Sequence, residues 1–305
     1  MGIEIERDRN EGTLTITQAD YIKKAAATYL TATTSKTFSS PVHTTGIDAF
    51  MKIACAANDI ERAQMRVRNH NLALMGTLLW ATITHPECAY YVAFLCQFMH
   101  DPSLAAWEAA LAVLCYLNHA QHIGITYCRA MKHLLKPFSD SSWGQVPLPF
   151  GGHAILFCVG AISWSARKLK ISPQSSAEAE YAVYATCAKD LKCIIQLLQD
   201  LGVTFKHPVQ IFCDSKAAIA TITNIGATAR NRHFERWMHI GREQFLSLFS
   251  IPIWISTKDM IADANTKALD KTTFLKFRAA LLNLKFVHSP TLNEILLQNW
   301  VEQQA

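Results

Sequence analysis

The sequence lacks the long apolar run that a membrane-spanning helix needs. Apolar stretches such as Ala89–Cys96 are far shorter than the roughly 20 residues required to cross a bilayer. The first residues, Met1–Glu6, also lack a basic stretch followed by an apolar one, which is the pattern of a secretory signal. We therefore expect a protein that is not anchored in a membrane and not secreted.

Paired cysteines are also missing. The nine cysteines are an odd number, and no two have the C-x-x-C spacing of zinc knuckles and redox motifs. We expect reduced thiols in the core of a cytosolic or nuclear protein. Hydrophobic residues make up 50% of the chain and charged residues 17%, which excludes a disordered tail or linker. The net charge of +5 is only a weak indication of a polyanionic partner.

The first part of the chain, residues 1–133, has a mainly helical pattern. It opens with a predicted β-hairpin, Gly2–Arg7 and Gly12–Thr17, and a helix begins after Thr17. Residues 34–50 are rich in Ser, Thr, Pro and Gly, and predict a loop. Further helices are expected at Leu72–Thr84, at Cys88–Met99, and from Asp101-Pro102 toward Tyr116, with Asp101 as the N-cap of the last one.

The second part, residues 134–283, predicts an α/β fold. Its order of elements indicates a mixed five-stranded sheet with helices on both faces. The expected strands are Leu134–Phe138, Gly152–Val159, Ala161–Ser165, Val209–Cys213 and Ile251–Ser256. The expected helices are Ser176–Leu201, Lys216–Thr223 and His233–Phe249, followed by two short ones. Residues 284–305 form a tail to which the sequence assigns no role.

Four acidic residues fall where strand ends and helix starts would bring them to one rim of this sheet. They are Asp140, Glu180, Asp214 and Asp263. Each aspartate alone has an ordinary structural explanation: a turn residue at Asp140, a helix N-cap at Asp214, or a first-turn acid at Asp263. For any one aspartate considered alone, we favour the structural explanation. The four together, on elements in this order, favour a catalytic cluster.

Spacing separates the two glutamates of the long predicted helix. Ser175 and Glu178 fit a capping box, in which Glu178 would fold back onto the N-cap amide. Glu180 instead lies on the apolar stripe that passes through Tyr184 and Leu191. A carboxylate at the top of such a stripe needs a partner, because an unpaired buried charge costs several kcal/mol. Glu180 is therefore the candidate for chemistry, and Glu178 for capping.

Four clustered carboxylates predict bound cations. Without cations they would repel one another and take up protons. Ligands that are all oxygen suit Mg²⁺ or Mn²⁺ rather than zinc. Two such ions, about 3.5–4 Å apart, are the usual arrangement for in-line displacement at phosphorus.

The helix expected from residue 233 combines an apolar and a basic face. Its basic side chains are Arg232, Arg236, His239 and Arg242, extended upstream by Arg230. On spacing alone this face predicts a solvated surface with local glutamate partners. A role in following a nucleic-acid backbone is the alternative.

At this point the residues resemble a known family. The second part resembles the ribonuclease H domain at the end of copia-type retrotransposon Pol polyproteins. The matching segments, in order, are Phe138–Trp143, Ile162–Ser165, Ser175–Tyr181, Phe212–Ser215, Arg232–Phe234 and Ala262–Lys267. In the first part, Gly2–Ile5 and Ile16–Ile22 resemble the segment just downstream of the polymerase active site of the same polyproteins. Similarity to their reverse transcriptase thumb and connection region lies in Gly76–Trp80, Thr84–Glu87 and Cys115–Leu117. The chain contains no Asp-Asp polymerase motif, so we do not expect it to polymerise DNA by itself.

The resemblance implies a ribonuclease H that hydrolyses the RNA strand of RNA–DNA hybrids with two Mg²⁺ ions, or Mn²⁺. Asp140 would bridge the metals, and Glu180, Asp214 and Asp263 would complete the ligand set. His233 would have a substrate or structural role. With a nucleic acid as the substrate, we expect Arg230, Arg232 and Arg236 of the basic face to contact it together with His233. The implied partner is the upstream reverse transcriptase domain, and the implied location is cytoplasmic, including virus-like particles, or nuclear.

Two other functions remain open on the sequence alone. The chain could be a catalytically inactive remnant that binds nucleic acid, or a structural connection module that docks on a polymerase. A hybrid-binding remnant would bind in a salt-sensitive way without cleavage, whereas a connection module would do neither.

Overall fold

The computed structural model describes residues 2–31, 38–68, 71–129, 135–143, 149–205, 208–224 and 235–284, without the side chains of residues 44, 66–68 and 235–239. These residues form two compact units. The first consists of the residues up to Thr126 together with Lys267–Leu284, and the second of Tyr127–Thr266. Each unit is described by itself.

The first unit is mainly helical, as expected from the sequence. Its hairpin, β1 (Glu4–Asp8) and β2 (Thr13–Thr17), belongs to a three-stranded sheet with β3 (Ile125–Cys128). Its helices are α1 (Ala19–Tyr29), α2 (Ile47–Met51), α3 (Asp59–Arg68), α4 (Asn71–Ala81), α5 (Ala89–Leu95), α6 (Leu104–His119) and α10 (Lys271–Leu282). Short 3-10 helices are η1 (Thr44–Gly46), η2 (Pro86–Cys88) and η3 (Cys96–Phe98).

Several local predictions for this unit were wrong. The expected loop at residues 34–50 contains the start of α2, because Phe50 is buried against Tyr91 and Phe94 and its packing outweighs a loop-like composition. Helix α6 is capped by Ser103, which accepts a hydrogen bond from the Ala106 amide, and not by Asp101. Helix α3 and strand β3 were not expected at all. Strand β3 has only four residues, and the ten residues of α3 are mostly charged or polar.

Gly76 gives a first testable prediction. It lies exposed inside α4, and a Cβ built on it meets nothing within 4 Å. Gly76→Ala should therefore raise the free energy of unfolding by about 0.5–1 kcal/mol, because glycine loses more backbone entropy in a helix than alanine does. Urea denaturation of both proteins measures the difference. An unchanged or lower midpoint would contradict the prediction.

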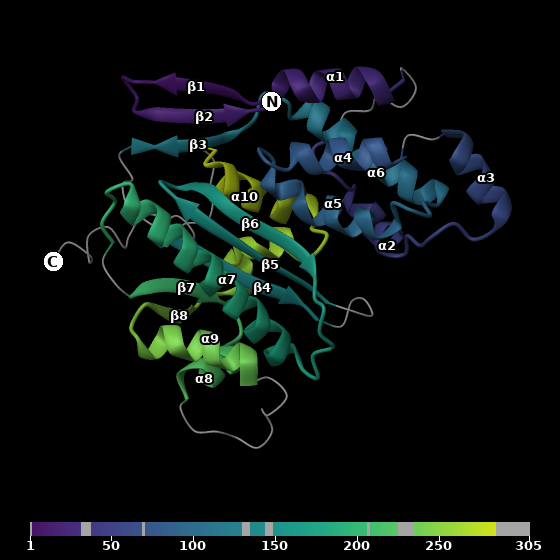
Figure 1. The fold of residues 1–305 in the computed structure, drawn as a ribbon. Coiled ribbons are helices and arrows are strands. Elements are labelled where there is room, and N and C mark those ends of the chain that lie inside the picture. Colours follow the sequence, from purple (N-terminus) through teal and green to yellow (C-terminus); the bar gives the residue numbers. More distant parts are fainter. Residues whose placement is uncertain are drawn as a thin grey trace. The chain divides into compact units, whose positions relative to one another are not determined.

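The second unit contains the five-stranded sheet (Figure 1). Its strands are β4 (Leu135–Ser142), β5 (Phe150–Phe157), β6 (Gly160–Lys168), β7 (Val209–Cys213) and β8 (Ser250–Trp254). They lie in the order β6-β5-β4-β7-β8; β5 is antiparallel to β4 and β6, and β7 is parallel to β4 and β8. The α/β class and the ribonuclease H-like mixed sheet expected from the sequence are confirmed.

Helices lie on both faces of this sheet, as two neighbouring glycines show. A Cβ on Gly151 would lie 2.5 Å from Val183 of α7 (Ser176–Asp200), and one on Gly152 would lie 2.7 Å from Asn265 of η7 (Ile261–Asn265). Because successive strand residues point to opposite faces, α7 and η7 cover opposite sides of β5. The other helices of the unit are α8 (Lys216–Thr223), α9 (Glu235–Leu246) and η6 (Thr257–Asp259).

The core of the second unit lies between α7 and the sheet. The buried stripe predicted for α7 is confirmed: Tyr184, Cys187 and Leu191 are almost fully buried. They pack with Ile155 and Ile211 of the sheet. Helix α9 ends at Leu246, earlier than predicted, and Leu248 beyond it is exposed with a positive φ of 54° rather than part of an apolar face.

The end of the chain differs from the expected layout. The sequence places a boundary at residue 283, whereas α10 packs within the first unit, where Arg278 donates a hydrogen bond to the Tyr116 hydroxyl. The expected functional domains, 1–133, 134–283 and the tail 284–305, stay a prediction. All of that tail except Leu284 lies outside the described residues.

Two expectations drawn from missing features can be compared with the structure. None of the helices that the structure describes is long and apolar enough to cross a membrane. All nine cysteines are free, as expected, but Cys55 and Cys193 are exposed and so do not belong to the core.

Candidate metal centre

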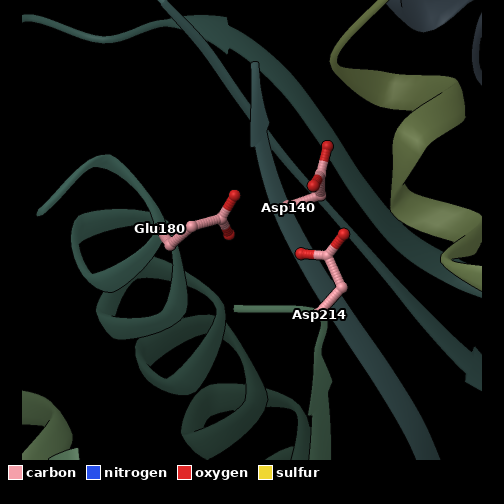
Figure 2. A group of neighbouring side chains, drawn as sticks. All are labelled: Asp140, Glu180 and Asp214. Carbon is pink, nitrogen blue, oxygen red and sulfur yellow. The ribbon is translucent and has the colours of Figure 1, made fainter. Parts of the chain in front are cut away.

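Three of the four predicted acids come together. Ligand oxygens of Asp140, Glu180 and Asp214 all lie within 4.8 Å of one another (Figure 2). They come from three elements: Asp140 from strand β4, Glu180 from the second turn of α7, and Asp214 from the residue after β7. Asp140 and Glu180 are buried, and Asp214 is half-buried.

The parallel pairing of β4 and β7 places the two aspartates. Phe138 is the register partner of Phe212, and their rings stack with centroids 5.0 Å apart. Asp140 and Asp214 each follow two residues later, so they stand at the same level on neighbouring strands. Asp140 lies inside β4, so the turn role considered for it is wrong.

Asp214 is not the helix cap either. Ser215 caps α8 by accepting a hydrogen bond from the Ala218 amide. The Asp214 carboxylate instead accepts a hydrogen bond of 2.7 Å from the Thr257 hydroxyl, and its backbone oxygen accepts one from the Trp254 indole. These contacts hold Asp214 toward the cluster and leave the capping function to its neighbour.

In the described part of the chain, hydrogen bonds hold only one of the two carboxylate oxygens of Glu180. Its Oε1 accepts hydrogen bonds of 3.1 Å from both the amide and the hydroxyl of Ser141, whereas its buried Oε2 has no hydrogen-bond partner among the residues that the structure describes. Burial, followed by the negative charges of Asp140 and Asp214, raises the pKa of Glu180 well above its usual value. A buried, unsatisfied carboxylate oxygen among two other carboxylates is the environment that a cation would relieve.

Glu178 differs from Glu180 as the spacing predicted. Ser175 is the N-cap of α7 and accepts a hydrogen bond from the Glu178 amide. The Glu178 carboxylate accepts one from the Gln174 amide, not from the N-cap amide as the capping box required. The N-cap is thus the predicted residue, the carboxylate contact lies one residue earlier than predicted, and Glu178 serves the helix start rather than the acid cluster.

Asp140 has a partner that the sequence did not reveal. The hydroxyl of Thr266, 126 residues away in the chain, donates a short hydrogen bond of 2.5 Å to Asp140 Oδ2. Ser141, Thr257 and Thr266 thus each orient one acid. A hydroxyl residue beside a candidate acid is too common to single out, so only the folded arrangement identifies these three.

Asp263 is not part of the three-carboxylate group. It lies in the first turn of η7 and is buried, with 4% of its surface exposed. The same segment contributes Thr266 to Asp140, and its backbone runs next to β5 at Gly152. A fourth ligand role for Asp263 stays a prediction, and its position also agrees with the first-turn acid considered from the sequence.

The predicted nucleic-acid contacts mostly fall outside the described part of the chain. Arg230, Arg232 and His233 lie outside the described residues, and Arg236 lies in α9 but without a described side chain. Arg242, which the sequence placed on the same basic face, donates hydrogen bonds to the Thr221 backbone oxygen and so links α9 to α8. The role proposed for the other four stays a prediction.

The three acids fit a hard divalent cation. All their ligand atoms are oxygen, which Mg²⁺ and Mn²⁺ prefer, and no described residue forms a hydrogen bond with Glu180 Oε2. Cys213 lies one residue before Asp214 and is buried, and burial raises the pKa of its thiol well above the usual value. The donor set therefore agrees with the cofactor expected from the sequence.

Curated relatives of the chain are retrotransposon polyproteins. It is 32% identical over 207 residues to the retrovirus-related Pol polyprotein from transposon RE2 of Arabidopsis thaliana, covering 67% of this chain and 14% of the relative. It is 28% identical over 279 residues to the one from transposon TNT 1-94 of Nicotiana tabacum, covering 90% and 20%. The chain thus spans a small part of each relative. No family model matches it.

Among solved structures, the chain is similar to LC11-RNase H1 in complex with an RNA/DNA hybrid. The match covers 44% of this chain and 94% of that one, with 16% identity and a TM-score of 0.33. At that score the likeness carries no argument, and the fold assignment rests on the strand order. The sequence relatives decide the family: this chain belongs to the retrovirus-related Pol polyproteins of copia-type retrotransposons.

Proposed function

We propose that the second unit is a metal-dependent ribonuclease H that hydrolyses the RNA strand of RNA–DNA hybrids, as part of a retrotransposon reverse transcriptase polyprotein. The observation that carries this proposal is the convergence of Asp140, Glu180 and Asp214 within 4.8 Å. The substrate class and the partnership with an upstream reverse transcriptase domain come from the family resemblance.

Each acid of the cluster has a definable task in this proposal. Asp140, Glu180 and Asp214 would hold two divalent ions, with Asp263 as a fourth ligand. Such ions, when bound, lower the pKa of an attacking water and stabilise the leaving oxygen. Ser141, Thr257 and Thr266 keep the three carboxylates oriented before the substrate arrives, which lowers the cost of assembling the site.

Proton delivery to the leaving oxygen falls to solvent. The segment from Thr257 to Met260, which contains η6, has no histidine, whereas the family resemblance implies one before the last acid in cellular ribonucleases H. Thr257 itself donates its hydroxyl to Asp214 and is committed to that contact. We therefore propose that a water molecule protonates the leaving group.

Cleavage of a labelled RNA–DNA hybrid in Mg²⁺ tests the proposal. Asp140→Asn and Asp214→Asn should each lower the cleavage rate at least about a thousandfold, because several kcal/mol of charge stabilisation are lost at about 1.4 kcal/mol per factor of ten. Asp200→Asn, at the exposed end of α7, is the matched control and should retain the parent rate. Equal rates in all four proteins would refute the assignment.

The same assay separates the alternatives. Salt-sensitive binding of the hybrid without cleavage by the parent protein would identify an inactive remnant. Neither binding nor cleavage would identify a structural connection module.

A further inference from the structure

The second unit contains a cavity that the acid cluster does not use. It has a volume of about 380 Å³ and lies between α7 and the strands β5 and β6. None of the three clustered acids lines it. Its size falls within the range of about 300–1,000 Å³ that small-molecule sites occupy.

A row of polar side chains crosses the sheet beside this cavity. Ser139, His153 and Ser165 are cross-strand partners on β4, β5 and β6, so they share one face of the sheet. That face is the one toward α7, because His153 is two residues from Gly151, which contacts Val183 of α7. His153 and Ser165 line the cavity. The same face also carries Leu135 and Ile155, which belong to the apolar core beneath α7.

His153 is the polar group at the base of the cavity. Only 1% of its surface is exposed. Its Nε2 lies 3.3 Å from the carboxylate of Asp190 on α7, yet without the geometry of a hydrogen bond, so this buried nitrogen has no hydrogen-bond partner within the described part of the chain. Burial lowers the pKa of His153 to about 4, which keeps the ring neutral. A neutral imidazole can donate to or accept from a ligand in the cavity.

The rim of the cavity is basic and its walls are apolar. Arg167, Lys168, Lys170 and Lys189 line it and are exposed, against a single lining acid, Asp190. The apolar walls come from Leu169, Ile171, Ala182 and Val183. The site thus presents a cationic entrance, an apolar middle and a polar base.

We propose that this cavity binds a nucleotide, with its base between the apolar walls and its phosphate at the basic rim. The ring nitrogens or exocyclic groups of the base would form hydrogen bonds with His153 and Ser165. An aliphatic acid with its carboxylate at the basic rim has no second polar group to do so. An inorganic phosphate would engage the rim but leave the walls and base unfilled, and a metal cation would meet four positive side chains. The nucleotide can be a free mononucleotide or one residue of a single strand.

Calorimetric titration of the full chain in EDTA tests this site without involving metal at the acid cluster. The probes are AMP, inorganic phosphate and a tetranucleotide of deoxyadenosine. AMP or the tetranucleotide should bind at least about tenfold more tightly than phosphate, since base contacts add to the charged ones. Tighter binding of AMP would indicate a free mononucleotide as the ligand, and tighter binding of the tetranucleotide would indicate one residue of a single strand.

Variants on α7 locate the binding. Lys189→Glu reverses a rim charge and should weaken nucleotide binding about tenfold or more. Lys192→Glu, exposed on the same helix but outside the lining, makes the same change of net charge and should have no effect. Thr186→Leu should fill the cavity and block binding, with circular dichroism confirming the fold. No nucleotide binding, phosphate binding of equal strength, or equal losses in both lysine variants would overturn the proposal.

Discussion

Glu180→Gln is expected to abolish hybrid cleavage while making the metal-free protein more stable. The loss of cleavage should be at least about a thousandfold, because the glutamine keeps the shape but removes one of three ligand charges. The gain in stability follows from the same change. Glu180 Oε2 is buried without a hydrogen-bond partner among the described residues, and an amide offers donors to the neighbouring carboxylates.

The stability gain should be about 1–3 kcal/mol in EDTA, the range for leaving a buried polar group unsatisfied. It should also depend on pH. The pKa of Glu180 is raised in the folded state above the usual 4.5, so the folded protein binds more protons than the unfolded one between those two values. The parent should therefore lose stability as pH rises through that window, and the variant should lose less.

Urea denaturation in EDTA at several pH values, together with the hybrid-cleavage assay in Mg²⁺, measures both effects. Glu178→Gln is the matched control, because it makes the same change two residues earlier in α7 at a carboxylate that bonds the Gln174 amide. That control should keep its cleavage rate and should not gain stability. A Glu180→Gln protein that is less stable than the parent in EDTA would contradict the electrostatic explanation.

Gly152→Ala is expected to destabilise the second unit and to weaken cleavage together. The new Cβ would lie 2.7 Å from the Cβ and from the backbone oxygen of Asn265. Backbone atoms cannot move aside as a side-chain tip can, so we expect a loss of about 3 kcal/mol in the free energy of unfolding. The displaced segment includes Thr266, which orients Asp140. A shift of about 1 Å there should cost about a hundredfold in rate.

Gly151→Ala provides the comparison on the opposite face of β5. Its Cβ would meet side-chain atoms of Val183 and Leu169 and would not touch the η7 segment. It should lower the stability by overpacking, yet reduce cleavage in the folded protein less than Gly152→Ala does. Urea denaturation and cleavage under native conditions rank the two variants. A larger loss of cleavage in Gly151→Ala would show that the η7 contact does not support the site.

Much of the second unit could be predicted from the sequence because its pattern is local. The boundaries of β7 and α8 match the prediction, and the long helix differs by one residue, since capping residues and apolar periodicity mark them. Strand β4 runs four residues further than expected, through Asp140 to Ser142. Its polar end residues are buried by neighbouring strands and by α7. Burial by other elements cannot be predicted from the sequence of the strand alone.

The site shows the same limit. The sequence identified Asp140, Glu180 and Asp214 through their placement on successive elements, and separated Glu180 from Glu178 by helix periodicity. It could not find Thr257 and Thr266, because each contacts an acid that is remote in the chain and hydroxyl residues occur everywhere. Nor could it predict the cavity beside His153, which exists only because β5, β6 and α7 pack at one edge.

The stacked rings of Phe138 and Phe212 have a consequence beyond packing. Because this pair fixes the register between β4 and β7, it also fixes the distance between Asp140 and Asp214. A register shift of one residue would turn one aspartate to the other face of the sheet. The carboxylate cluster would then be lost even in a fully folded chain. The distance between the two proposed metal ligands therefore depends on an apolar pair that is not itself part of the acid cluster.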